Sequence, residues 1–169
     1  LEGSLGAGAL MGAGGALTLT LSYTSSGNEP GFAYLRSLDI GATRDLSGAT
    51  GANVDFGRAD LAGADLSGAA LPKADFGRAV VTHAKFVGAD LTGADLSRTD
   101  LTEADLSKAN LTKTGFARAV LVRANLTGAN LDHADLYLAD LTGAVLDGAR
   151  TDSASFCRTT MPDGSINNK

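Results

Sequence analysis

Residues 54–158 divide into 21 consecutive five-residue units with no insertion or deletion, and this period limits the possible folds more than any other feature. The first units are VDFGR, ADLAG, ADLSG, AALPK and ADFGR. From the second unit on, the first position is Ala in 18 of 20 units, with Thr99 and Thr114 as the exceptions. The third position is Leu, Phe or Val in 20 of 21 units, and the second is Asp or Asn in 13. A period of five excludes an amphipathic helix, which needs 3.6, and an ordinary strand, which needs two.

Uninterrupted A(D/N)LXX units resemble the pentapeptide-repeat proteins, and the resemblance covers about two thirds of the chain. It implies an all-β fold, a right-handed quadrilateral parallel β-helix (a pentapeptide-repeat solenoid) in which four pentapeptides make one coil. The array then gives about five coils, or a rod on the order of 25 Å long at an inter-strand spacing of about 4.8 Å. Ala and Leu or Phe would fill a narrow interior, and Gly and short polar residues suit turns at the corners.

The pattern divides the chain into four parts. Residues 1–31 are a Gly-rich lead-in with a possible strand at 17–23, where Leu alternates with Thr or Ser. Residues 32–53 are expected to form an N-terminal cap and a degenerate first coil, and 54–158 the β-helix. Residues 159–169 are expected to be a C-terminal cap or tail, in which PDGS forms a turn that ends the coil.

Residues 20 apart should lie above one another on the same side of the rod. The third positions of one side form the expected structural core column: Phe56, Phe76, Leu96, Phe116, Leu136 and Phe156. The same side carries Arg at most fifth positions and Asp at most second positions. These residues are our candidate interaction face: Arg58, Arg78, Arg98, Arg118, Arg158, Asp55, Asp75, Asp95 and Asp135.

Two interpretations of this face remain open. The Arg and Asp columns could neutralise one another and keep the rod soluble, because stacked like charges repel. Alternatively, the Arg column could present forked donors at regular spacing to an acidic partner, since guanidinium groups suit carboxylates and phosphates. Arg118 and Arg158 lack an Asp in their own pentapeptides, so this hypothesis places the recognition surface towards the C-terminal end.

The sequence does not indicate an enzyme. DFG occurs twice, at Asp55 and Asp75, but without the glycine-rich loop, strand Lys and catalytic loop of a kinase. A regular rod would give successive carboxylates similar surroundings, whereas a catalytic pair needs an asymmetric pocket. His83 and His133 are expected at exposed corners, and the single Cys157 excludes an intrachain disulfide. We therefore predict no catalytic, cofactor-binding or metal-binding residues and no cofactor.

The resemblance suggests two roles. We favour a non-catalytic protein-interaction scaffold, with another protein as the partner, because regular sides of different chemistry suit such a function. The alternative is a DNA mimic that binds a type II topoisomerase such as gyrase and confers antibiotic resistance. Mimicry needs a strongly negative rod, but residues 54–158 carry 14 acidic and 11 basic residues, a net charge of −3. The tail is also too short and too rich in Pro, Gly and Asn for a C-terminal dimer helix, and the oligomeric state stays open.

The net charge and the uncharged N-terminal stretch indicate which partners and which compartment to expect. The net charge of the whole chain is −5, which argues against direct nucleic-acid binding. Residues 3–28 carry no charge, but Gly and Thr dilute the stretch below what a membrane span requires. Association with a membrane or the cell envelope through this segment is a second alternative. We favour the cytoplasm, with export or a lumenal compartment as the alternative if the N-terminal segment is processed or anchored.

Overall fold

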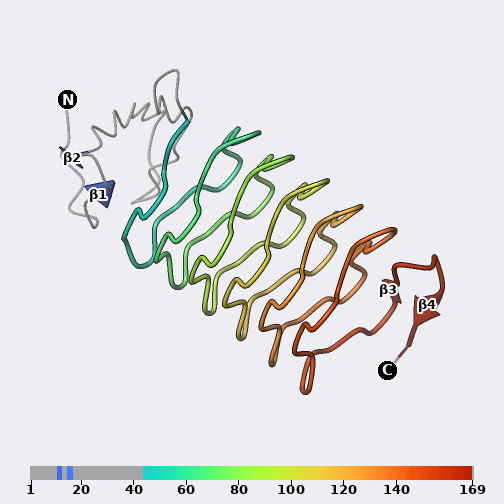
Figure 1. The fold of residues 1–169 in the computed structure, drawn as a ribbon. Coiled ribbons are helices and arrows are strands. Elements are labelled where there is room, and N and C mark those ends of the chain that lie inside the picture. Colours follow the sequence, from blue (N-terminus) through green and yellow to red (C-terminus); the bar gives the residue numbers. More distant parts are fainter. Residues whose placement is uncertain (1–10, 13–14, 17–43, 169) are drawn as a thin grey trace, which may run out of the picture.

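The computed structural model describes residues 11–12, 15–16 and 44–168 (Figure 1). Near the start of the chain, strands β1 (Met11–Gly12) and β2 (Gly15–Ala16) pair antiparallel. At the other end, β3 (Thr159–Thr160) and β4 (Ile166–Asn167) form a second antiparallel pair. The strand expected at 17–23 and most of the cap expected at 32–53 lie outside the described residues.

A repeating coil makes up residues 44–158. Parallel β-bridges join residues 20 positions apart, from the pair Asp45 and Asp65 to the pair Asp140 and Thr160. Every bridge lies at the second position of a pentapeptide, so four pentapeptides complete one coil of a β-helix. Figure 1 shows the coils stacked in sequence order along a rod. Residues 44–53 take part in the same pairing, since Thr50 bridges to Ala70.

Backbone hydrogen bonds run in both directions along the rod. The second-position N–H donates to the first-position carbonyl of the coil before, and Asp75 N lies 2.8 Å from Val54 O. The third-position N–H donates to the coil after, and Phe76 N lies 2.7 Å from Asp95 O. The first-position N–H closes a turn onto the preceding unit, with Ala79 N 2.8 Å from Phe76 O. The coils are thus held together by the backbone on all four sides.

The fourth-position N–H explains the preference for Asp or Asn at the second position. In residues 44–158 this N–H makes no backbone hydrogen bond, and an Asp or Asn two residues earlier accepts it instead. The bond is 2.7 Å from Gly77 N to Asp75 Oδ1. Pro72 and Pro162, which have no N–H to satisfy, both occupy fourth positions in units whose second position is neither Asp nor Asn.

The fifth position has a left-handed backbone. From Gly48 to Gly148 every fifth-position residue has φ between 56° and 69°. The first-position N–H then closes the turn, as in a type II turn whose second central residue needs φ above zero. Gly adopts this conformation freely, whereas any other residue type there is strained. This explains the glycines of the ADLXG units, and it means that every Arg of the candidate face sits on a strained backbone position.

Small and large apolar side chains alternate in the interior. First-position Ala and third-position Leu, Phe or Val are buried through most of the rod. Phe56 and Phe76 stack with ring centroids 4.8 Å apart, and Phe86 from another side meets Phe76 edge-on at 5.8 Å. Such offset-stacked and edge-to-face pairs are favourable arrangements of aromatic rings.

Threonine replaces Ala at three buried first positions. Each hydroxyl donates to a third-position carbonyl 23 residues earlier: Thr99 Oγ1 lies 2.7 Å from Phe76 O and Thr114 Oγ1 lies 2.9 Å from Leu91 O. Thr159 bonds in the same way at 2.6 Å. A buried hydroxyl is costly unless it is hydrogen-bonded, so this bond accounts for the exceptions in the Ala column.

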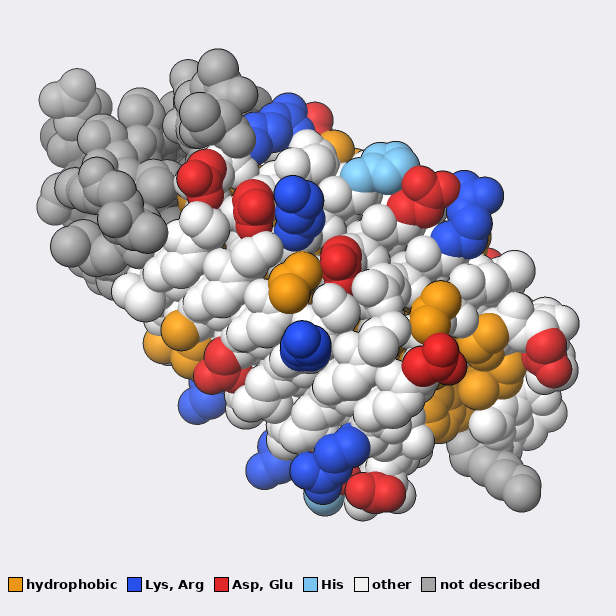
Figure 2. Space-filling model, in the orientation of Figure 1, with side chains coloured by type: hydrophobic (Ala, Val, Ile, Leu, Met, Phe, Trp, Pro, Cys, Tyr) orange, Lys and Arg blue, Asp and Glu red, His pale blue; other side chains and the backbone are white. Residues whose placement is uncertain are grey.

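The C-terminal end of the rod is covered less completely. Leu146, Thr151 and Phe156 are half-buried, in contrast to the buried third positions from Phe56 to Leu141. After Met161 the chain turns through Pro162–Gly164, and Met161 N donates to Ser165 O at 2.7 Å. The turn joins β3 to β4, and Thr160 of β3 also bridges to Asp140 of the preceding coil. Figure 2 shows hydrophobic side chains gathered near this end.

Candidate interaction face

The residues selected from the sequence lie as follows in the structure. All five Arg and all four Asp of the candidate face are exposed at the corners and sides of the rod. Phe56, Phe76, Leu96, Phe116 and Leu136 are completely buried, and Phe156 is half-buried. The face is therefore a row of charged side chains directly outside an apolar column.

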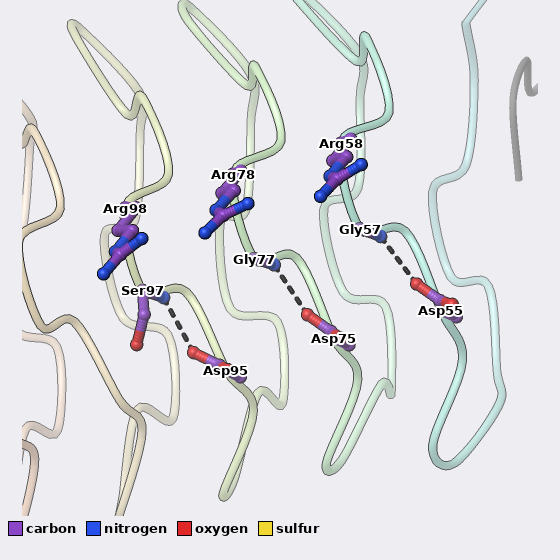
Figure 3. A pocket seen from close by; sticks show the side chains of 9 residues that line it. All are labelled: Asp55, Gly57, Arg58, Asp75, Gly77, Arg78, Asp95, Ser97 and Arg98. Carbon is purple, nitrogen blue, oxygen red and sulfur yellow. Dashed lines mark hydrogen bonds between the residues drawn. The ribbon is translucent and has the colours of Figure 1, made fainter. Parts of the chain in front are cut away.

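A groove runs along the N-terminal half of this face. Its volume is about 370 Å³. Figure 3 shows Arg side chains along one wall, Asp side chains along the other, and fourth-position residues between them. We call this site the charged groove; its lining residues are Asp55, Gly57, Arg58, Asp75, Gly77, Arg78, Asp95, Ser97 and Arg98.

The fourth-position residues form the floor of the charged groove. The floor of the charged groove is Gly57, Gly77 and Ser97, which project little or no side chain. Later coils carry Ala117, Tyr137 and Cys157 at the same position. In addition, Gly115 replaces Asp on the acidic wall. Arg118, Arg158 and Asp135 do not line the groove, which lies in the N-terminal half of the face. The recognition surface expected from the sequence at the C-terminal end stays a prediction.

The residues of the walls were predicted from the sequence, whereas those of the floor were not. The signal was nevertheless present, because both DFGR units carry Gly at the fourth position, whereas most other units carry Ser, Thr or Ala there. A Cβ added to Gly77 would lie 2.9 Å from Asp75 Oδ1, the movable end of a side chain, and Asp135 keeps its bond to the floor beside Tyr137.

The two walls differ in how their charges are engaged. On the acidic wall, one oxygen of each carboxylate accepts a backbone N–H from the floor (Figure 3). These bonds measure 2.8 Å for Asp55, 2.7 Å for Asp75 and 2.8 Å for Asp95. On the basic wall, Arg78 and Arg98 form no ion pair with any carboxylate of the described residues. The guanidinium groups of Arg78 and Arg98 therefore stay apart from the carboxylates across the floor.

Acidic side chains on other sides of the rod do contact Arg or His side chains. Glu103 contacts both Arg123 and His83, with His83 Nδ1 3.2 Å from Glu103 Oε2. His133 Nδ1 lies 3.0 Å from Asp132 Oδ1. Figure 2 shows acidic and basic side chains interspersed on the face in view. The charged groove differs from these paired groups because its Arg side chains form one column and its Asp side chains form another.

Two carboxyl groups outside the groove have a pKa below the ordinary value. The pKa of Asp45 is lowered by a hydrogen bond from the Ser47 side chain and by the Ser47 backbone N–H. The pKa of Asp163 is lowered in the same way by Ser165, in the turn between β3 and β4. Both groups have turn-capping roles rather than catalytic surroundings.

The described residues also bear on metal binding and on membrane insertion. Among them, no three His, Cys, Asp or Glu side chains are grouped so that they could hold a metal ion. The same part of the chain contains no helix of the length and apolarity needed to cross a bilayer. Cys157 is a half-buried free thiol.

The 20-residue pairing and the regular sides define a solenoid repeat protein. The pentapeptide-repeat profile matches in eight copies, at residues 45–78, 74–113 and 119–156. The chain belongs to the pentapeptide-repeat family, whose members form right-handed quadrilateral β-helices and are generally non-enzymatic. No curated protein matches the chain.

Several solved structures are similar. A pentapeptide repeat protein of the Arabidopsis thaliana thylakoid lumen is 40% identical, covers 52% of this chain and has a TM-score of 0.46. HetL, involved in heterocyst differentiation regulation in Nostoc sp. strain PCC 7120, is 34% identical over 73% of this chain, with a TM-score of 0.26. The present chain spans 64% of each of these two proteins. QnrB1, a plasmid-mediated fluoroquinolone resistance protein, is 21% identical over 74% of this chain and 77% of its own, with a TM-score of 0.33.

Proposed function

We propose that this protein is a non-catalytic interaction scaffold and that the charged groove binds another protein. The observation that carries this proposal is the separation of charge in the groove. Arg78 and Arg98 are exposed and form no ion pair within the described residues, although carboxylates stand across the floor. Guanidinium groups that are not engaged by the protein itself are suited to bidentate contacts with carboxylates of a partner.

The rest of the molecule supports a scaffold. The backbone pairs coil to coil and the interior is filled by Ala, Leu and Phe, so the outward side chains are not needed for the core. An array of this kind holds its surface groups at fixed spacing, which lowers the ordering cost of binding.

The proposal can be tested by affinity capture from cells that produce the protein. The wild-type protein is compared with an Arg78→Glu/Arg98→Glu variant, and captured proteins are quantified by mass spectrometry. Glu is compatible with the left-handed fifth position, because Glu103 already occupies one with φ of 58°. The matched control is Lys108→Glu/Lys113→Glu, which makes the same charge change on other sides of the rod.

We expect at least one protein whose recovery falls about tenfold with the groove variant and stays unchanged with the control. If the three baits recover the same proteins in the same amounts, the groove is not the binding site and the proposal is wrong. Circular dichroism of both variants verifies that the fold is retained.

DNA mimicry towards a type II topoisomerase is the alternative function. Mimicry requires a predominantly acidic surface, and the charged groove carries as many Arg as Asp residues. We therefore place the scaffold ahead of the mimic. A gyrase supercoiling assay separates the two: inhibition or protection at micromolar protein would favour the mimic, and no effect would exclude it.

A further inference from the structure

The charged groove has two walls of opposite sign and no net charge. Three carboxylates line one wall and three guanidinium groups the other, with Gly57, Gly77 and Ser97 between them. A uniformly acidic ligand is attracted by the Arg wall and repelled by the Asp wall, and a uniformly basic ligand meets the reverse. Coulomb terms of opposite sign at similar distances largely cancel. The groove therefore favours a ligand that carries both charges, each on its own side.

An extended peptide meets this requirement when its charges alternate. Successive side chains of an extended chain point to opposite sides, and each residue advances the chain by about 3.4 Å. A segment of alternating acidic and basic residues thus directs all its carboxylates to one side and all its ammonium groups to the other. Laid along the floor, it faces the Arg wall with one set and the Asp wall with the other.

The dimensions fit a short segment. Coils repeat at about 4.8 Å, so the three coils of the groove span about 10 Å between the first and the last, which accommodates about four extended residues. Gly at two floor positions allows the main chain of the segment to approach closely. One oxygen of each wall carboxylate bonds to the floor, which fixes the Asp side chains in position for a ligand cation.

We propose that the charged groove recognises an extended segment of its partner protein in which acidic and basic residues alternate. This inference rests on the function proposed above and adds the chemistry of the partner. Arg78 and Arg98 contact the acidic side chains, and Asp75 and Asp95 contact the basic ones.

The test uses the full chain and four labelled synthetic peptides. The first repeats the dipeptide Glu-Lys, the second has the same composition with all Glu before all Lys, and the third and fourth contain only Glu or only Lys. Binding is measured by fluorescence anisotropy at low ionic strength, where screening is weak. The block peptide is the matched control, because it offers the same charges but each of its halves presents a single sign to both walls.

We expect the alternating peptide to bind about tenfold more tightly than the block peptide. The difference is no larger because each exposed charge pair contributes little to the binding free energy. The Arg78→Glu/Arg98→Glu variant should lose this binding, and Lys108→Glu/Lys113→Glu should keep it. Equal affinities for the alternating and block peptides, or tighter binding of the all-Glu peptide, would overturn the inference.

Two further outcomes are distinguishable. If affinity capture depends on the groove but the peptides are not discriminated, the scaffold function stands and the alternating segment is wrong. If the protein alone dimerises in sedimentation velocity and the groove variant is monomeric, the occupant is a second copy of this chain, and the inference is again wrong.

Discussion

Along one side of the β-helix, the coils at residues 54–98 and those at 114–158 share the same backbone pairing but differ in their outward side chains. Asp95 bridges to Gly115, and Gly115 bridges to Asp135, in the same parallel register as the pairs before them. The N-terminal half carries the charged groove, whereas Tyr137 and Cys157 occupy the floor positions of the C-terminal half. The comparison teaches that first and third positions maintain the fold, and that second, fourth and fifth positions can be exchanged to shape a surface.

The largest effect should come from a change that reaches the interior shared by both halves. Leu106 is completely buried, so Leu106→Lys places an unpaired charge in the core and should destabilise the protein by about 4 kcal/mol or more. Leu138 is 37% exposed at a fifth position, and Leu138→Lys should change the free energy of unfolding by about 0.5 kcal/mol or less. Urea denaturation followed by circular dichroism measures both, and equal midpoints would contradict the assignment of inward and outward positions.

The second prediction gives the N-terminal half a fourth-position side chain from the C-terminal half. Gly77→Tyr copies the residue at position 137 and should fill the charged groove. We expect the affinity for the alternating peptide to fall about tenfold while the melting temperature changes little. Ala117→Tyr is the control outside the groove, and a similar loss of affinity there would show that binding does not require the hollow floor.

The third prediction separates capping from binding. Asp75 and Asp135 both accept a fourth-position N–H, at 2.7 Å from Gly77 N and 3.0 Å from Tyr137 N. Replacement of either by Ala should destabilise the fold by about 1 kcal/mol, in the range of lost side-chain caps. Only Asp75→Ala should also weaken peptide binding, because Asp135 does not line the groove. Asp75→Asn should restore stability but not binding, since an amide oxygen still accepts the N–H.

The smallest effects are expected at the left-handed corners. Gly63 and Gly143 have the same φ of 69°, so replacement of either by Ala should cost about 1 kcal/mol or less through backbone strain. A Cβ at Gly63 meets nothing within 4 Å, whereas one at Gly143 lies 3.3 Å from the Arg123 side chain. We therefore expect Gly143→Ala to be slightly the more destabilising of the two in urea denaturation.

Much of the architecture could be expected from the sequence. The repeat of five resembles the pentapeptide-repeat family, this resemblance implies four units per coil, and the bridges between residues 20 apart agree with it. The roles of individual exceptions could not be predicted in the same way. Thr99 disrupts the Ala pattern, and its tolerance depends on a carbonyl 23 residues earlier that only the coiled geometry brings within 2.7 Å.

The position of the groove was also beyond sequence reasoning. Counting Asp and Arg within each pentapeptide favoured the C-terminal end, because Arg118 has no Asp in its own unit. Such a count does not consider the floor, where Gly57 and Gly77 have no side chain. It also treated each Asp as a counter-ion for its Arg, whereas the carboxylates of Asp75 and Asp95 bond to the backbone between the walls.

The 20-residue bridge offset has a consequence for how such a chain could change its length. An insertion of four pentapeptides adds a whole coil and leaves every downstream column in line. An insertion of a single pentapeptide keeps Ala and Leu inside but rotates all downstream columns by a quarter turn, so an Arg column would continue on the neighbouring side. An insertion of one residue shifts the interior positions outwards and should be rejected by the core. Insertions in steps of five residues can therefore move the outward-facing columns to another side of the rod while the interior positions stay the same.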